Sequence, residues 1–197
     1  MSADRGEFRR IGERERLELG FLSVVTGTFV GPDGFTFERE IVRHPGAVCV
    51  VPLEADRKVV AVRQYRSAID RPVLEIPAGK MDVPGEAPLL GARRELAEEV
   101  GLEAGTITPL ASFFNSPGFT DEHTFMFLGE ELVEVGQATV GIEEQYMTIE
   151  RFALDEIGEL VRRGEIIDAK TIIACYLALD LLAQRAAGGE RGGGPTR

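Results

Sequence analysis

Apolar and polar positions follow a helical pattern between residues 85 and 102, the stretch around which the rest of the chain is organised. On a helix, at about 100° per residue, Glu95 and Glu99 lie one turn apart along the flank of an apolar stripe. The stripe that we expect to be buried consists of Leu89, Ala92, Leu96 and Val100. The pattern therefore predicts an amphipathic helix with Gly101 as its C-cap.

Short apolar runs rich in β-branched and aromatic residues predict strands on both sides of this helix. The expected strands are residues 21–30, 35–42, 47–53, 59–65, 73–79, 107–114, 124–128 and 146–152. Two further helices are expected at residues 154–163 and 169–186, with Asp168 as the N-cap of the second. This order predicts an α/β fold, an α/β/α sandwich with a mixed sheet.

The ends of the chain lack this periodicity. Residues 1–16 alternate charged and small residues, which predicts a mobile or loosely held lead-in. The first two strands form a small antiparallel hairpin, which is marginal alone and needs a partner surface. We therefore expect an N-terminal β arm over residues 1–43 and a main domain over 44–186. The glycine-rich residues 187–197 are expected to be a disordered tail, and residues 135–145 a flexible loop.

Composition narrows the class of protein. A chain of 197 residues with 44% apolar content is long enough for one sizeable core with a small appendage. The net charge of −11 argues against nucleic acid or an anionic membrane as a general partner. Cys49 and Cys175, each inside an apolar run, predict buried thiols in a reducing compartment. With no apolar run of transmembrane length and no signal-peptide pattern, we expect a cytoplasmic protein.

The acidic side chains of the central helix point to a metal site. Glu95 and Glu99 at positions i and i+4 repel each other by roughly 0.2–0.5 kcal/mol on an isolated helix. Glu98, one turn from Glu95, adds to the crowding unless a cation lies among the carboxylates. A divalent metal would reverse the sign of the interaction. The alternative is a solvated amphipathic helix on which Arg94 and Glu98 form an ordinary surface pair.

The order of residues favours the metal. Residues 94–102 read RELAEEVGL, and Glu86 stands eight positions before Arg94. This stretch resembles the Nudix box, whose core is R-E-U-x-E-E-x-G-U with U an aliphatic residue. The box also asks for a glycine six positions before Glu86, where this chain has Lys80. Gly79 precedes it, and we interpret this as a one-residue insertion in a loop, where added length costs little.

Features outside the box resemble the ADP-ribose pyrophosphatase subfamily of Nudix hydrolases. Pro117 lies sixteen positions after Gly101, and residues 63–66 and 74–79 read RQYR and LEIPAG. The resemblance implies hydrolysis of the pyrophosphate of ADP-ribose to AMP and ribose 5-phosphate. It also implies a homodimer in which the N-terminal arm exchanges across the interface.

Two alternatives remain open at this point. The first is a Nudix pyrophosphatase of other specificity, for a nucleotide sugar or an oxidised nucleoside triphosphate, although Pro117 argues against the triphosphate. The second is a non-catalytic Nudix module that senses a nucleotide; its acids need not be kept, whereas here they are intact.

Charge and resemblance together assign the metal site. Oxygen ligands suit Mg²⁺, with Mn²⁺ able to replace it, and Glu95 and Glu99 supply them at a fixed separation. The resemblance adds the backbone carbonyl of Ala78 and the side chain of Glu98. Supporting positions are Arg94, Glu86 and Gly79, with Arg94 orienting a glutamate rather than contacting substrate.

The remaining assignments concern the base and the substrate. The resemblance places the general base on a late loop, where Glu143 and Glu144 are candidates; Glu144 is preferred, and Glu98 is the next choice. Arg63 or Arg66 could hold a phosphate in a bidentate way. The other expected substrate-binding residues are Glu75, Ser116, Pro117, Gly118 and Glu122. Phe21 of a partner's arm is a candidate for stacking on adenine, and no role is assigned to His44 or His123.

Overall fold

The computed structural model describes residues 6–136 and 146–189. They form two compact units, which are described separately. Unit 1 comprises Met1–Ala47 and Phe113–Thr124, and unit 2 comprises Val48–Ser112 and Phe125–Arg197, each as far as it is described. No helix within the described ranges is long and apolar enough to cross a membrane.

Unit 1 is built on an antiparallel sheet of three strands in the order β1-β2-β3. The strands are β1 (Arg9–Leu19), β2 (Leu22–Val30) and β3 (Thr36–Arg43). The predicted hairpin corresponds to β2 and β3. The prediction of a loosely held lead-in was wrong for residues 9–16, which belong to β1. Every side chain of β1 is exposed, so the strand depends on backbone pairing with β2 and leaves no hydrophobic alternation in the sequence.

Residues 113–124 join unit 1 through specific contacts with the end of β3. The Val42 amide donates to the Phe119 carbonyl at 2.8 Å, and Val42 forms a parallel bridge with Thr120. Asp121 accepts from the Arg43 guanidinium at 2.8 Å and from the His44 amide at 2.9 Å. The sequence-based boundary at residue 43 does not capture this segment, because its contacts are distant along the chain.

Unit 2 contains two sheets, one of four strands in the order β7-β4-β9-β8 and one of three in the order β10-β5-β6. The strands are β4 (Ala47–Pro52), β5 (Lys58–Arg66), β6 (Arg71–Glu75), β7 (Ala78–Lys80), β8 (Leu102–Phe114), β9 (His123–Glu134) and β10 (Thr148–Ala153). The strand expected over residues 73–79 is divided at Pro77, which cannot donate to a ladder. Its two halves belong to different sheets.

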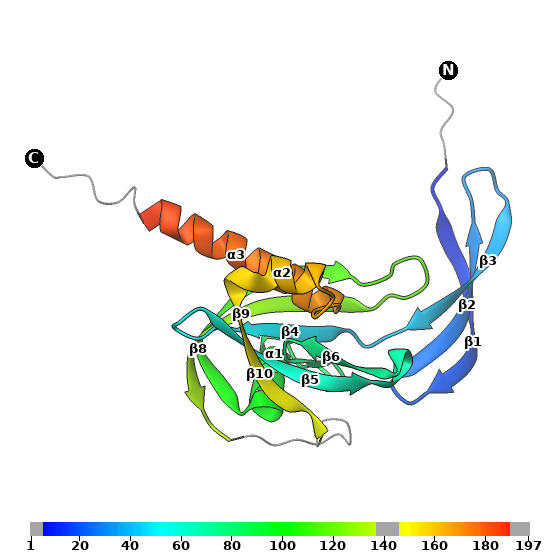
Figure 1. The fold of residues 1–197 in the computed structure, drawn as a ribbon. Helices are drawn as coiled ribbons and strands as arrows, with labels where there is room; N and C mark the ends of the chain where they lie inside the picture. The colour runs from blue at the N-terminus through cyan, green and yellow to red at the C-terminus, as the bar shows by residue number, and fades with distance from the viewer. Residues whose placement is uncertain (1–5, 137–145, 190–197) are drawn as a thin grey trace, which may run out of the picture. The chain divides into compact units, whose positions relative to one another are not determined.

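Helices lie on both sides of the sheets of unit 2. Figure 1 shows α1 (Pro88–Val100) on one side and α2 (Ile157–Arg162) with α3 (Ala169–Gly189) on the other. Short 3-10 turns, Ser67–Ile69 and Leu154–Glu156, follow β5 and β10. The predicted α/β/α sandwich is confirmed. Helix α3 continues to Gly189, three residues beyond the expected end.

The inner face of α1 packs on β4 and β5. Ala92, Leu96 and Val100 are buried, as expected, in a core cluster with strand residues that include Val48 and Val62. Full burial of a side chain such as Leu96 stabilises the fold by roughly 1.5–3 kcal/mol. Leu89 was expected on the same stripe but is 39% exposed, because it lies in the first turn of the helix, before that core begins.

Candidate active site on helix α1

Helix α1 begins and ends where its sequence requires. Pro88 occupies the first turn, where its missing N–H costs no hydrogen bond. At the other end Gly101 adopts a left-handed φ of 67°, and its amide donates to the carbonyls of Ala97 and Leu96. Gly101 is therefore the C-cap that the sequence predicted. These ends fix which residues face inward, and Glu95 and Glu99 are among the buried ones.

Glu95 lies against strand β7, which precedes the helix in the chain. Its side chain is next to Gly79, and a Cβ on that glycine would come closer than 3.0 Å to the Glu95 carboxylate. Real Cβ atoms essentially never approach another heavy atom so closely. A side chain at position 79 would therefore have to displace the end of the Glu95 side chain, and the one-residue insertion after Gly79 leaves this contact in place.

Glu99 is held by the same strand. Its Oε2 accepts a hydrogen bond from the Ala78 amide at 3.0 Å, and only 4% of the residue is exposed. The sequence analysis assigned the Ala78 carbonyl to the metal site. The hydrogen bond made by the Ala78 amide is a separate contact of the same residue. Two glutamates one turn apart are therefore both buried and both in contact with residues 78–79.

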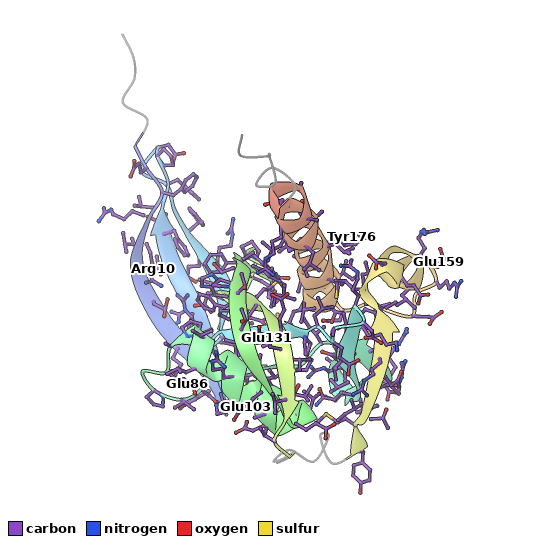
Figure 2. The ribbon with its side chains drawn as sticks, turned by 90° about the vertical axis from the view of Figure 1, so that its left-hand side faces the viewer. Arg10, Glu86, Glu103, Glu131, Glu159 and Tyr176 are labelled. Atoms are coloured by element: carbon purple, nitrogen blue, oxygen red, sulfur yellow. The ribbon has the colours of Figure 1, made fainter. Side chains whose placement is uncertain are left out.

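Arg94 lies among three carboxylates. Its guanidinium donates to Glu86 at 3.2 Å, to Glu95 at 2.6 Å and to Glu98 at 3.0 Å. Figure 2 shows Glu86 beside the start of α1. The hydrogen bonds with Glu86, together with the charges and hydrogen bonds of the other two, raise the pKa of Arg94 despite its partial burial. Arg94 thus places a positive charge among these acids, and its expected role in orienting a glutamate remains a prediction.

The donors at this site suit a hard divalent cation. Glu95, Glu98 and Glu99 offer carboxylate oxygens, and two of these acids are buried, where an unpaired charge is costly. Among the described residues, no group of three His, Cys, Asp or Glu side chains surrounds a single metal position. Arg94 contacts Glu95 through Oε1 and Glu98 through Oε2, and it thus holds these two carboxylates next to each other. The chemistry of the donor set therefore fits Mg²⁺ or Mn²⁺.

The two arginines expected to bind phosphate are each paired with a carboxylate. Arg63 makes a bidentate contact with Glu150 at 2.6 and 3.0 Å. Arg66 makes one with Glu75 at 2.6 Å for both bonds. Glu75, expected to bind substrate, is only 1% exposed and also lies 3.5 Å from Lys170. The substrate roles of these three residues remain predictions.

Four of the other expected substrate-binding residues belong to unit 1. The Ser116 carbonyl accepts from the Phe119 and Thr120 amides, which makes a tight turn around Pro117 and Gly118. The Glu122 carbonyl accepts from the Asn115 amide at 3.1 Å. The turn that the sequence predicted here is therefore formed, and its binding role remains a prediction.

The candidates for the general base fall in different parts of the chain. Glu143 and Glu144 lie outside the described residues. Glu98, the third candidate, is on α1, where its side chain is 33% exposed and bonded to Arg94. The aromatic candidate Phe21 packs edge-on against the His44 ring within unit 1, at a centroid distance of 5.5 Å.

The sequence analysis missed two residues at the start of α3 that contact Glu75 and Ile76, the residues just before Pro77 and β7. Lys170 reaches Glu75, and Thr171 Oγ1 accepts from the Ile76 amide at 3.0 Å. No signal in the sequence indicates the contact of Lys170 with Glu75, because Asp168, two positions before the lysine, already provides an acidic partner at 2.7 Å.

Comparisons with known proteins show the family of this chain. The model of the NUDIX domain family matches residues 42–175. The ADP-ribose pyrophosphatase of Bacillus subtilis is 40% identical over 149 residues, which are 75% of this chain and 80% of the relative. The methanol dehydrogenase activator of Bacillus methanolicus is 41% identical over the same length and shares.

A solved structure also shares the fold. A crystal structure of an ADP compounds hydrolase superposes with a TM-score of 0.80 at 21% sequence identity, covering 93% of this chain and 98% of that one. The family match contains Glu86 and the whole of α1, so Arg94 and its glutamate partners lie within it in the order of the box. The chain therefore belongs to the NUDIX family and is a Nudix hydrolase.

Proposed function

We propose that this hydrolase cleaves the pyrophosphate of ADP-ribose, with Mg²⁺ as its metal ion. Nudix hydrolases generally use divalent metals. The observation that carries the proposal is the pair of buried glutamates on α1, Glu95 and Glu99, in contact with residues 78–79. The 40% identity with the Bacillus subtilis ADP-ribose pyrophosphatase supports the choice of substrate.

The reaction adds water across a phosphoanhydride. The water oxygen bonds to one phosphorus, the bridging P–O bond breaks, and the products are AMP and ribose 5-phosphate. When bound, a divalent ion supplies charge neutralisation for the phosphate oxygens and activation of the attacking water. In this proposal Glu95, Glu99, Glu98 and the Ala78 carbonyl hold that ion.

Other groups of the protein orient the metal ligands and the substrate, and one of them takes a proton from the attacking water. Arg94, held by Glu86, fixes the position of Glu95. Arg66 contacts Glu75 through Nε and Nη2, so Nη1 is the nitrogen that this pair leaves for a substrate phosphate. Arg63 is proposed as a second phosphate ligand, and Glu144, with Glu143 as the alternative, as the base that takes the proton from water.

The remaining assignments concern assembly and location. The turn of Ser116, Pro117 and Gly118, with Glu122, is proposed to bind the terminal ribose. A homodimer is proposed because β1 exposes several apolar side chains on an all-exposed strand. A cytoplasmic location is proposed because Cys49 and Cys175 are both free and buried thiols.

The alternative substrate is another nucleoside diphosphate derivative, such as a nucleotide sugar. The methanol dehydrogenase activator matches this chain as well as the pyrophosphatase does, so identity alone does not choose the substrate. The test is a turnover panel with Mg²⁺ that contains ADP-ribose, a GDP-sugar, a UDP-sugar and a nucleoside triphosphate. We expect the highest kcat/KM for ADP-ribose. A higher value for a sugar nucleotide would transfer the function to that class.

A further inference from the structure

The chain crosses from one sheet of unit 2 to the other just before the site. Strand β6 ends at Glu75, β7 begins at Ala78, and Ile76 and Pro77 connect them. Ile76 is buried, and its amide donates to Thr171 Oγ1 at 3.0 Å. The Pro77 carbonyl accepts from the Val50 amide at 3.0 Å. A buried crossing needs such partners, and one of them comes from a side chain of α3.

Lys170, next to Thr171, contacts the last residue of β6. Its Nζ lies 2.7 Å from Asp168 Oδ1 and 3.5 Å from Glu75 Oε2, and its side chain is only 18% exposed. Asp168 in turn accepts from the Thr171 amide at 2.9 Å and from its hydroxyl at 2.7 Å. The first turn of α3 therefore holds both a backbone amide and a buried carboxylate of the crossing segment.

Glu75 connects this helix start to Arg66. Its two carboxylate oxygens receive two 2.6 Å bonds from Arg66, and Oε2 also faces Lys170. The hydrogen bonds with Glu75 raise the pKa of Arg66, and the charges of Glu99 and Asp168 act in the same direction. Positive and negative groups thus alternate from Asp168 through Lys170, Glu75 and Arg66 to Glu99.

The crossing segment is held from both sides. Glu99 of α1 accepts from the Ala78 amide, and Thr171 of α3 accepts from the Ile76 amide. These two contacts, with the Lys170–Glu75 pair, fix residues 75–78 along their length. Any displacement of this segment moves Ala78 relative to Glu99 and moves the carboxylate that orients Arg66.

We propose that Lys170, together with Thr171, is a positioning residue of the hydrolase that sets the place of Ala78 and Arg66. It acts through Glu75 and the Ile76 amide rather than on the substrate. The part that concerns Arg66 rests on the proposed function. The part that concerns Ala78 is independent of the substrate, because metal binding alone reports on it.

The test replaces Lys170 by residues of similar length. Lys170→Met removes the charge, Lys170→Arg keeps it, and Lys58→Met is the matched control in an exposed ion pair with Asp56. Each variant is titrated with Mn²⁺, with the free ion measured by electron paramagnetic resonance. The melting temperature without metal and the kcat and KM for the best substrate of the panel complete the set.

We expect Lys170→Met to weaken Mn²⁺ binding and to lower kcat/KM, each by about 10–100-fold, as when a residue that supports metal ligands is removed. Lys170→Arg should recover most of both losses, and Lys58→Met should leave both unchanged. A lower melting temperature with wild-type Mn²⁺ affinity and wild-type kcat/KM would overturn the proposal, since a purely structural ion pair predicts that result.

A second pair of variants keeps the proposal testable if Lys170→Met does not fold. Thr171→Val keeps the shape and removes the hydroxyl that accepts from Ile76, whereas Thr171→Ser retains it. The positioning role is supported if Thr171→Val binds Mn²⁺ more weakly than Thr171→Ser does. It is overturned if the two variants bind Mn²⁺ with equal affinity. If the wild-type protein binds Mn²⁺ but does not hydrolyse ADP-ribose, the proposed substrate fails while this comparison still decides the positioning role.

Discussion

The carboxylate of Glu95 lies in the space that a Cβ atom on Gly79 would fill. The two residues are sixteen positions apart in the sequence and come from different elements, a short strand and a helix. Their contact fixes the distance between the backbone of β7 and the acidic face of α1. A side chain at position 79 would compete with the Glu95 carboxylate for space, whereas the backbone conformation of Gly79 does not itself call for glycine.

Replacing Gly79 by alanine should therefore damage the site. The added methyl group has to push the Glu95 carboxylate away, and a displacement of about 1 Å in a catalytic site can cost 10²-fold in rate. We expect kcat/KM to fall by about that factor. Gly12→Ala is the control, because a Cβ there meets Thr28 only at an ordinary 3.8 Å. Equal rates for the two variants would show that the position of Glu95 does not matter for turnover.

Much of the fold could be predicted from the sequence because burial leaves a periodic trace. Strand β4 is buried throughout and reads as a continuous apolar run, and α1 carries a helical stripe. Strand β1 has no such trace, since all its side chains are exposed and it is held by backbone pairing and polar side-chain contacts such as Arg16 with Thr26. The early start of β8 at Leu102 was missed because Gly105 and several charged or polar residues interrupt the pattern.

The candidate site also contains some contacts that could be predicted from the sequence and others that could not. Glu95, Glu99, Arg94 and Glu86 could be predicted together because they lie on or beside one helix, where spacing implies proximity. The contacts of Glu75 with Lys170 and of Ile76 with Thr171 span 95 residues, and no local pattern reports such a distance. Arg63 and Arg66 were predicted by type, but their carboxylate partners could not be.

Asp168 should make the stability of the protein depend on pH. Burial alone would raise its pKa, but Lys170 and the hydrogen bonds from Thr171 outweigh burial and hold the pKa below the ordinary 3.8. The ionised form is therefore favoured in the folded state. The contribution of the ionised Asp168 carboxylate to the free energy of unfolding is fully present above about pH 3.8. It is lost as pH falls through the lower pKa of the folded state.

Asp168→Asn should lower the free energy of unfolding at pH 7 by about 1–2 kcal/mol, since the charge interaction with Lys170 is lost and the cap weakened. The difference from wild type should shrink below pH 3.8. Urea unfolding without metal at several pH values measures it. Asp180→Asn, exposed on the same helix, is the control and should change stability by less than about 0.5 kcal/mol. A difference that stays constant with pH would rule out the charge as its source.

The general base can be located by comparing neighbouring acids. Glu144→Gln should lower kcat by roughly 10²–10⁴-fold with little change in KM or Mg²⁺ affinity, because base catalysis acts only in the transition state. Glu143→Gln should have a much smaller effect. Rates are measured against Mg²⁺ concentration, since excess metal partly rescues a lost ligand but not a lost base. The opposite ranking would assign the base to Glu143. If neither substitution lowers the rate, the base is assigned to Glu98.

The dimer can be tested at the exposed face of β1. Leu17 is 51% exposed on this strand, and an interface there would bury it. We expect a dimer by light scattering at micromolar concentration and a shift toward monomer in Leu17→Glu. Val133→Glu is the matched control, because Val133 is 62% exposed on β9 in unit 2. A wild-type monomer with full activity would contradict the assembly.

The most direct test of the central claim is the Mg²⁺ dependence of ADP-ribose turnover in Glu99→Gln, with the products identified by chromatography. Glu103→Gln, an exposed acid just beyond α1, is the control. The wild type and the control should form equal amounts of AMP and ribose 5-phosphate and lose activity in EDTA. Glu99→Gln should lose most turnover, because a carboxylate that binds the metal is replaced by a neutral amide. Near-normal, Mg²⁺-dependent turnover in Glu99→Gln would contradict the assignment of the metal site to α1.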